Sequence, residues 1–338
     1  KMNKYLKTAI KTLCMNSGVL RATCEVATKR ILILGYHSIQ DIPSKSSLGI
    51  GNGNIHSPDV FCEQMQLISE YYNPVTLDDL EMYLKGIYEL PRRAIIVTFD
   101  DGFIDNYNIA LPIMDKYNIK AAFFLTVGAI ENRISPWYYV LRKMFYETKK
   151  ENWKENYCDK SWSLIHDVDK RKAFLHASST CAKMTEGRQL DYLKTIEKAL
   201  DIRASFSDEI MMTWDHAKDV ISRGHIIGSH TISHPNLAYI NKQELYAEMF
   251  QSKKIIENNL CNSVNHFSYP HPIMDPHCNK QTISVSEEIG YRTALTTIPG
   301  YVRKGDNPLK LCRMGTPKYK SRIDFMWKIE CAFNGIIV

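Results

Sequence analysis

The sequence predicts an α/β fold, an irregular or incomplete (β/α) barrel interrupted by a helical insertion. Short apolar runs typical of buried parallel strands alternate with stretches whose apolar residues follow a helical period. Polar residues gather directly after several of these runs, which is where catalytic groups lie in parallel α/β sheets. Residues 131–204 break the alternation. They are rich in aromatic and charged residues and poor in β-branched runs, so we expect them to form the insertion.

The clearest strand–helix–strand unit begins with the run AIIVTF at 94–99, which predicts a buried strand. A helix is predicted at 106–117 and the next buried strand at 121–127. An Asp-Asp-Gly turn at 100–102 joins the first strand to the helix. On its own, such a turn indicates no more than a helix cap. However, two adjacent carboxylates at the end of a buried strand are costly to place there, which points to a function.

A second cluster far downstream supports that interpretation. His230 and His234 are four residues apart in the stretch HTISH. If this stretch turns helically, both imidazoles lie on one face and can converge on one ion. One carboxylate and two imidazoles, with positions left open for water, outline a catalytic metal site. This ligand set suits zinc and would also hold cobalt, nickel or iron.

These residues resemble the motifs of the polysaccharide deacetylases that share the NodB homology domain, carbohydrate esterase family 4. The first family motif, Thr-Phe-Asp-Asp-Gly, is present at 98–102, and the second, His-Ser/Thr-x-x-His, at 230–234. The resemblance covers residues 31–130 and 205–315. It implies a NodB-type barrel over these two segments and the hydrolytic removal of an acetyl group from a glycan.

The resemblance also implies roles for the motif residues. Asp101 would bind a divalent metal ion together with His230 and His234, and Asp100 would be the general base that takes a proton from water. Neighbouring side chains in an extended segment point to opposite sides. One carboxylate can therefore face the ion while the other faces the water.

The third family motif, Arg-x-Pro-Tyr/Phe, is altered in this chain. The matching stretch is Ser-Tyr-Pro-His at 268–271, in which serine replaces the arginine and His271 replaces the aromatic residue. The backbone N–H of His271 can still stabilise an oxyanion, because that role does not depend on the side chain. Arg313, at the end of a last strand predicted at 309–313, is a candidate partner for Asp100 in place of the missing arginine.

The last family motif, Leu-x-His, normally supplies the general acid, but here it reads Leu-Cys-Arg at 311–313. The chain resembles instead the exopolysaccharide deacetylases in which a Tyr-His pair after the first strand takes this role. That pair is present as Tyr36 and His37, after a strand predicted at 31–34. His37 is therefore the candidate general acid, provided that it lies across the ion from Asp100, and His271 is the next candidate.

Three further segments complete the predicted organisation. Residues 1–30 resemble a basic amphipathic helix, which either packs on the core of its own domain or contacts a membrane surface through residues 1–20. The insertion at 131–204 is expected to bury its aromatic residues in a small core of its own. Because it follows a barrel strand, it would overhang the catalytic face and influence substrate choice. Residues 316–338 are expected to form a C-terminal helix or tail.

Composition narrows the classes of protein. The 338 residues carry a formal net charge of +6, which permits an anionic glycan or a membrane surface as a partner but is too diffuse to indicate nucleic acid. Nine cysteines without a CxxC pair indicate reduced thiols rather than a disulfide framework. We find no signal-peptide pattern and no stretch of membrane-spanning length. We therefore expect a cytoplasmic protein, or one bound peripherally at the inner face of the membrane.

The leading functional hypothesis is a metal-dependent enzyme that removes the N-acetyl group from an acetylamino sugar of a surface polysaccharide or its precursor. The expected partner is therefore an acetylated glycan. One alternative is an O-acetyl esterase on the same scaffold, because the metal chemistry scarcely distinguishes an ester from an amide. Another is a non-catalytic glycan-binding protein, for which the altered third and last motifs provide some support. Product analysis and metal content would separate these hypotheses.

Overall fold

The computed structural model describes most of the chain. The described ranges are 30–41, 55–155, 160–202, 209–316 and 321–337. The amphipathic helix predicted at 1–30 lies outside the described residues, apart from Arg30.

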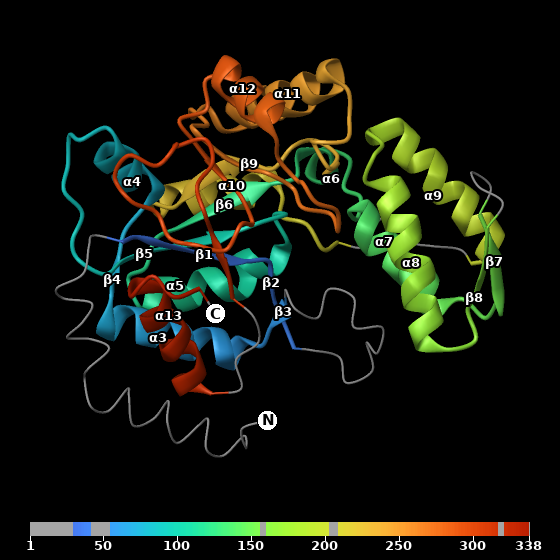
Figure 1. The fold of residues 1–338 in the computed structure, drawn as a ribbon, viewed down its shortest axis with the longest axis horizontal. Coiled ribbons are helices and arrows are strands. Elements are labelled where there is room, and N and C mark those ends of the chain that lie inside the picture. Colours follow the sequence, from blue (N-terminus) through green and yellow to red (C-terminus); the bar gives the residue numbers. More distant parts are fainter. Residues whose placement is uncertain (1–29, 42–54, 156–159, 203–208, 317–320, 338) are drawn as a thin grey trace.

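The centre of the molecule is a parallel sheet that curls into a half-barrel surrounded by helices, so the predicted α/β barrel is confirmed (Figure 1). Within the described residues its strand order is β11-β10-β9-β6-β5-β1-β12, and β4 pairs with the start of β5. Every pairing in this sheet is parallel. The strands are β1 (Leu32–Tyr36), β4 (Asn73–Pro74), β5 (Ala94–Phe99), β6 (Ala121–Leu125), β9 (Ile226–Ser229), β10 (His266–Ser268), β11 (Thr293–Leu295) and β12 (Met314–Gly315).

Helices follow most of the strands and cover the sheet (Figure 1). Several begin at the capping residues that the sequence contains: Ser57 caps α3, and Asn241 forms a capping box with Glu244 in α11. None of the helices in the described ranges has the length and apolar character needed to cross a bilayer. The helices are α3 (Pro58–Tyr71), α4 (Leu77–Leu84), the π-helical η1 (Asn106–Ala110), α5 (Leu111–Lys116), α6 (Val127–Glu131), α10 (Trp214–Ser222), α11 (Lys242–Leu260), α12 (Lys280–Ile289) and α13 (Arg322–Phe333). Two short strands, β2 (Ser38–Ile39) and β3 (Ile55–His56), pair with each other outside the main sheet.

The central strands are buried on both faces, which explains why their sequences are continuous apolar runs. Val97 and Phe123 belong to the main core, together with residues of α3, α5 and α11. The neighbouring positions Ile96 and Phe124 pack on the other face, with Leu77 of α4 and its surroundings. This double burial holds the ends of the strands, and the polar residues that follow them, in a rigid frame.

The last strand differs from the prediction. Its position is Met314–Gly315 rather than 309–313, and Leu311 makes only an isolated bridge to Leu295. Asn307 explains the difference, because its side chain accepts a hydrogen bond from Leu309 N at 2.8 Å and its carbonyl accepts one from Lys310 N. The turn chemistry of Asn307 therefore overrides the strand tendency of the apolar residues that follow it.

The insertion forms a lobe beside the barrel (Figure 1). Its described residues form three helices, α7 (Trp137–Glu147), α8 (Asp167–Cys181) and α9 (Glu186–Leu200). It also contains an antiparallel hairpin of β7 (Asn152–Lys154) and β8 (Ser161–Ser163), which we did not predict. Most of its large aromatic side chains pack in a core separate from that of the barrel, a cluster that includes Trp137, Phe145, Trp153, Phe174 and Tyr192.

Candidate active site

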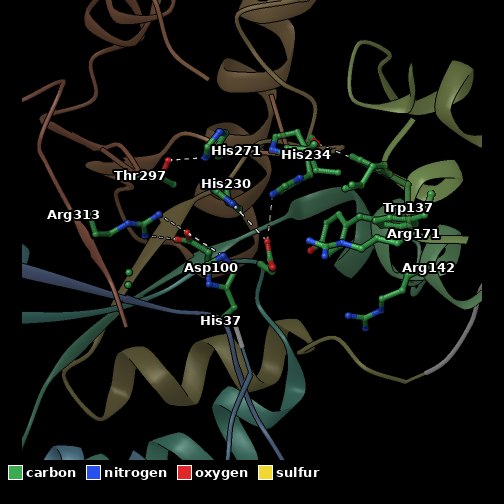
Figure 2. A pocket seen from close by; sticks show the side chains of 18 residues that line it. His37, Asp100, Trp137, Arg142, Arg171, His230, His234, His271, Thr297 and Arg313 are labelled. Carbon is green, nitrogen blue, oxygen red and sulfur yellow. Dashed lines mark hydrogen bonds and ion pairs between the residues drawn. The ribbon is translucent and has the colours of Figure 1, made fainter. Parts of the chain in front are cut away.

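The carboxyl ends of several strands meet at one cleft, a cavity of about 450 Å³ (Figure 2). His37 follows β1, the Asp-Asp turn follows β5, and His230 follows β9. All seven residues that the sequence indicated line this cavity: His37, Asp100, Asp101, His230, His234, His271 and Arg313.

Asp101, His230 and His234 form a compact, buried group in the cleft. The Nε2 atoms of His230 and His234 lie 3.6 Å and 3.5 Å from Oδ1 of Asp101. One ligand atom from each of the three residues lies within 4.8 Å of the other two. Donors at about 2.0–2.2 Å from a tetrahedral zinc ion are themselves roughly 3.3–3.6 Å apart, so the spacing fits such an ion.

The segment that carries the two histidines is an irregular loop, so the helical turn expected at 230–234 is wrong. Thr231 has a φ of 70° and His234 a φ of 55°, both in the left-handed region that interrupts a right-handed helix. Each such residue costs about 1–3 kcal/mol unless the surroundings compensate. Hydrogen bonds from Val127 N to Thr231 O and from Gly128 N to Ile232 O help to hold the loop in this shape. The two imidazoles converge because the loop is fixed in this way, not because of helical spacing.

Glu248 of α11 anchors this loop. Its Oε2 accepts hydrogen bonds from the backbone N–H groups of Ile232 and Ser233 at 2.8 Å and 2.9 Å, and its Oε1 accepts one from the Ser233 hydroxyl at 2.5 Å. Glu248 is almost fully buried. Sequence reasoning missed it, because no motif surrounds Glu248 in the sequence.

Glu248→Ala is expected to weaken metal binding by about 10- to 100-fold, the usual cost of losing a group that positions metal ligands. Without the carboxylate, the two backbone N–H groups lose their acceptor and the loop can relax from its left-handed conformation. Isothermal titration with Zn²⁺ or Co²⁺ measures the change. Gln251→Ala, an exposed position on the same helix, is the control. Unchanged affinity in a folded Glu248→Ala protein would show that the loop holds its shape without the carboxylate.

The protonation of the three residues also fits a cation. Nδ1 of His230 lies 2.7 Å from the carbonyl oxygen of Ser268, so the ring donates its proton there and keeps the lone pair of Nε2 toward Asp101. Burial lowers the pKa of both His230 and His234, which keeps them neutral. Burial and the neighbouring charge of Asp100 raise the pKa of Asp101 to about 8. Oδ1 of Asp101 is buried without a hydrogen-bond partner among the described residues. These groups match the requirements of a divalent ion, which would take the place of a proton on Asp101.

Asp100 has a different partner. The Nη1 and Nη2 atoms of Arg313 donate to its two carboxylate oxygens at 2.8 Å and 2.5 Å, and both side chains are buried. Burial alone would raise the pKa of Asp100, but the Arg313 guanidinium outweighs this effect and holds the pKa well below its usual range. Gly35 leaves space for this contact, since a Cβ there would lie 3.2 Å from Cδ and Nε of Arg313.

The two carboxylates diverge, although not for the reason expected. Asp101 has a φ of 75°, so the pair forms a tight left-handed turn rather than a continuation of the extended strand. Gly102, with a φ of 84°, continues the turn. The turn directs Asp100 toward Arg313 and Asp101 toward the histidines.

His37 lies beside Asp100, with 3.9 Å between its Nε2 and Oδ2 of Asp100. Asn106 donates to the carbonyl oxygen of His37 at 2.6 Å and so holds its backbone at the end of β1. Burial lowers the pKa of His37 to about 4, which leaves the ring neutral near pH 7. The assignment of His37 as the acid carried the condition that it lies across the ion from Asp100, whereas the structure shows the two groups as neighbours.

His271 lies at another part of the cleft lining (Figure 2). Its Nδ1 is 2.8 Å from the hydroxyl oxygen of Thr297, and its Nε2 is 3.2 Å from Oδ1 of Asp275. The ring is thus held by neighbours outside the group formed by Asp101 and the two histidines.

The insertion also contributes to the cleft. Trp137 donates from its indole N–H to the carbonyl oxygen of His234 at 3.2 Å. The ring of Tyr138 lies 4.8 Å from the ring of His234, and Arg142 and Arg171 line the same cavity. We had assigned the aromatic residues of the insertion to its own core. For Tyr138 that assignment is incomplete, since the residue packs at the edge of that core and also faces the site.

The fold and the carboxylate pair at the end of β5 match those of a known family of carbohydrate deacetylases. The sequence profile of the polysaccharide deacetylase family matches residues 88–294, more than half of the chain, and the chain belongs to that family.

Individual relatives are distant. YxkH of Bacillus subtilis (strain 168), which carries the name of a polysaccharide deacetylase, is 21% identical over 285 residues, 84% of this chain and 71% of the relative. The deacetylase PplD of Streptococcus pyogenes, solved with acetate, aligns with a TM-score of 0.61 at 19% identity over 89% of this chain and 98% of its own. IcaB from Ammonifex degensii aligns with a TM-score of 0.57 at 16% identity over 90% of this chain and 97% of its own. At these identities the structural matches establish the fold.

Proposed function

We propose that this carbohydrate deacetylase is a metal-dependent N-deacetylase of an acetylamino sugar in a surface polysaccharide or its precursor. The observation that carries the proposal is the buried group of Asp101, His230 and His234 next to Asp100, which is paired with Arg313. The spacing of the three donors, their neutral imidazoles and the unpartnered carboxylate oxygen support a divalent cation at this position.

Asp101, His230 and His234 would hold the metal. Zinc is the first candidate, and cobalt, nickel and iron suit the same donors. When bound in such a site, a divalent cation lowers the pKa of a water molecule and polarises the acetyl carbonyl.

The protein's own residues would then manage the protons. Asp100 takes a proton from water, whose oxygen bonds to the acetyl carbon, and Arg313 keeps Asp100 ionised and oriented for this step. The C–N bond breaks, the nitrogen leaves as an amine with a proton, and acetate is the second product. The backbone N–H of His271 remains a candidate donor to the oxyanion.

His37 is the proposed source of the proton for the amine. Because burial keeps its ring neutral, His37 must first gain a proton, and its neighbour Asp100 can supply it. The 3.9 Å between the two groups exceeds hydrogen-bond reach, so the proton passes through one water molecule or after the groups close on the substrate. Arg313 holds the pKa of Asp100 below that of His37, so the proton passes in the favourable direction. The nitrogen of the departing amine is more basic than either group, so the last transfer is favourable as well.

An O-acetyl esterase remains the alternative, because the same residues could cleave an ester. The proximity of His37 to Asp100 favours the amide, since a departing amine needs a proton more than a departing alkoxide of a sugar hydroxyl, which water can protonate. One structural relative, from Aggregatibacter actinomycetemcomitans, is described as a de-N-acetylase, which agrees with this choice.

Product analysis tests the proposal. The zinc-loaded protein is incubated with oligomers of N-acetylglucosamine and with the same sugars O-acetylated, and released acetate and new amines are both measured. We expect one free amine for each acetate released. Acetate released only from the O-acetylated sugars, without new amines, would establish the esterase instead.

The partner and the location are part of the proposal. An acetylated glycan is the expected partner, with no role for nucleic acid. A cytoplasmic position, or peripheral contact with the inner face of the membrane through residues 1–20, remains a prediction from the sequence. Fractionation of cells that produce the tagged protein would test it.

A further inference from the structure

The insertion adds a cationic wall to the active-site cleft. Arg142 of α7 and Arg171 of α8 both line the cavity that holds the site residues. Figure 2 shows both side chains directed from the insertion helices toward this cavity. Three further residues of these two helices also line the cavity. Tyr138 lies one turn before Arg142 on α7. Phe174 and Leu175 lie one turn after Arg171 on α8. Each helix therefore presents one continuous face to the cleft.

The charge of this wall is not balanced by the carboxylates of the cleft lining. Among the described residues, the charged side chains of the lining are the guanidinium groups of Arg142, Arg171 and Arg313 and the carboxylates of Asp100 and Asp101. Arg313 and Asp100 form a bidentate pair, and the charge of Asp101 would be engaged by a divalent cation. The described part of the lining therefore carries more positive than negative charge, and more so with the metal bound.

Arg142 is the better shielded of the two arginines. It is half-buried, and its guanidinium lies 5.3 Å from the centre of the Tyr139 ring. It also lines a neighbouring hollow of about 230 Å³ that reaches Asp101 and contains Asp105, a carboxylate already hydrogen-bonded by Ser38. A guanidinium partly withdrawn from water gains more from an approaching anion than an exposed one does.

Arg171 is exposed on the surface of α8, and an exposed arginine is ordinarily a solvated residue that binds no ligand. Two observations distinguish it from such a residue. Arg171 has no hydrogen-bond or ion-pair partner within the described ranges. Its neighbour Lys172 is not part of the cavity lining and pairs with Asp169 of the same helix at 3.0 Å. The paired Lys172 therefore lies outside the cavity lining, whereas the adjacent Arg171 belongs to it.

We propose that Arg142 and Arg171 bind an anionic group, a carboxylate or a phosphate, on a sugar next to the one that is deacetylated. This inference rests on the proposed function and names its substrate class as an acidic glycan. The planar guanidinium matches both kinds of oxygen pair in a bidentate geometry. The cavity of about 450 Å³ lies within the range of roughly 300–1,000 Å³ that is usual for ligand sites.

The test compares three N-acetylated oligosaccharides of similar length. One is a neutral oligomer of N-acetylglucosamine, one alternates N-acetylglucosamine with glucuronic acid, and one carries a phosphate monoester. The readout is the ratio of kcat/KM for each acidic substrate to kcat/KM for the neutral one. Arg171→Gln and Arg142→Gln are each expected to lower this ratio by about 10-fold, the scale of a charge-assisted hydrogen bond. Lys172→Gln, which removes the same charge beside the cleft, is expected to leave the ratio unchanged.

The outcomes separate this inference from the proposed function. The acidic substrate that gives the higher ratio identifies the group as carboxylate or phosphate. Equal ratios in wild-type protein and both arginine variants, with acetate released from all three substrates, would overturn the inference and leave the deacetylase intact.

Equilibrium binding to Asp100→Asn protein tests the inference in the opposite case, in which the wild-type protein releases no acetate from any of the three substrates. Tighter binding of an acidic oligosaccharide that Arg171→Gln abolishes would support the anionic site even if no acetate were released. Arg171→Lys, which keeps the charge, should retain part of the preference.

Discussion

Asp101→Asn is expected to abolish metal binding and activity while making the metal-free protein more stable at pH 8. The pKa of Asp101 is raised to about 8 by burial and by the charge of Asp100. The native state therefore holds a proton that the unfolded chain has already lost above about pH 4. Between about pH 4 and pH 8 the metal-free wild type should lose stability as the pH rises, and asparagine removes that loss. The metal ligand is thus a destabilising residue until its ion is bound.

Thermal or urea unfolding at pH 5 and pH 8, with and without Zn²⁺, measures both effects. In wild-type protein the ion at 100 times its dissociation constant should add about 2.7 kcal/mol to the free energy of unfolding. The Asn variant should gain nothing from the ion and should exceed the metal-free wild type at pH 8 by about 1 kcal/mol or more. Asp191→Asn, an exposed position on α9, is the control. A variant that still gains stability from zinc would mean that the ion binds elsewhere.

Asp100→Asn is expected to keep the metal and lose about 10²- to 10⁴-fold in kcat, the usual range for removal of a general base. The amide keeps one acceptor for Arg313, so the fold should survive, but it cannot take a proton from water.

His37→Ala is expected to cause a loss of kcat in the same range, because the amine would depart without a proton.

Steady-state kinetics with measured metal content separates these effects from loss of the ion. Added imidazole should restore part of the activity of His37→Ala and none of that of Asp100→Asn. Because His37 is neutral before the reaction, its removal should lower kcat without shifting the pH at which activity falls. Near-normal activity of His37→Ala would move the acid role elsewhere, with His271 as the next candidate.

The sequence predicted those parts of the fold that depend on local patterns. Continuous apolar runs such as 94–99 identify strands buried on both faces, and in a parallel sheet the residues that follow them must meet at one edge. For this reason His37, Asp100 and His230 could be placed together without knowledge of the strand order. The Tyr36-His37 pair could be placed at the same edge of the sheet, because it comes at the end of β1.

The remaining features depend on contacts between distant segments. Spacing alone suggested a helix at 230–234, whereas the loop is shaped by Glu248 and by N–H groups at the start of α6. The altered third motif pointed to Arg313 as the partner of Asp100, and the structure shows this contact between residues 213 positions apart. The close approach of the Arg313 side chain to Gly35, in contrast, has no local signal in the sequence. Arg142 and Arg171 could not be assigned to the cleft, because no local signal shows which face of an inserted helix turns toward the barrel.

A titration of acetate release against added zinc tests the central claim most directly. The protein is first stripped with a chelator, and its activity on an N-acetylated oligosaccharide is followed as zinc is restored. We expect no activity in the stripped protein, a linear rise with added zinc and a break at one ion per chain, with no response from Asp101→Asn. Undiminished acetate release by protein that contains far less than one ion per chain would contradict the proposed metal-dependent mechanism.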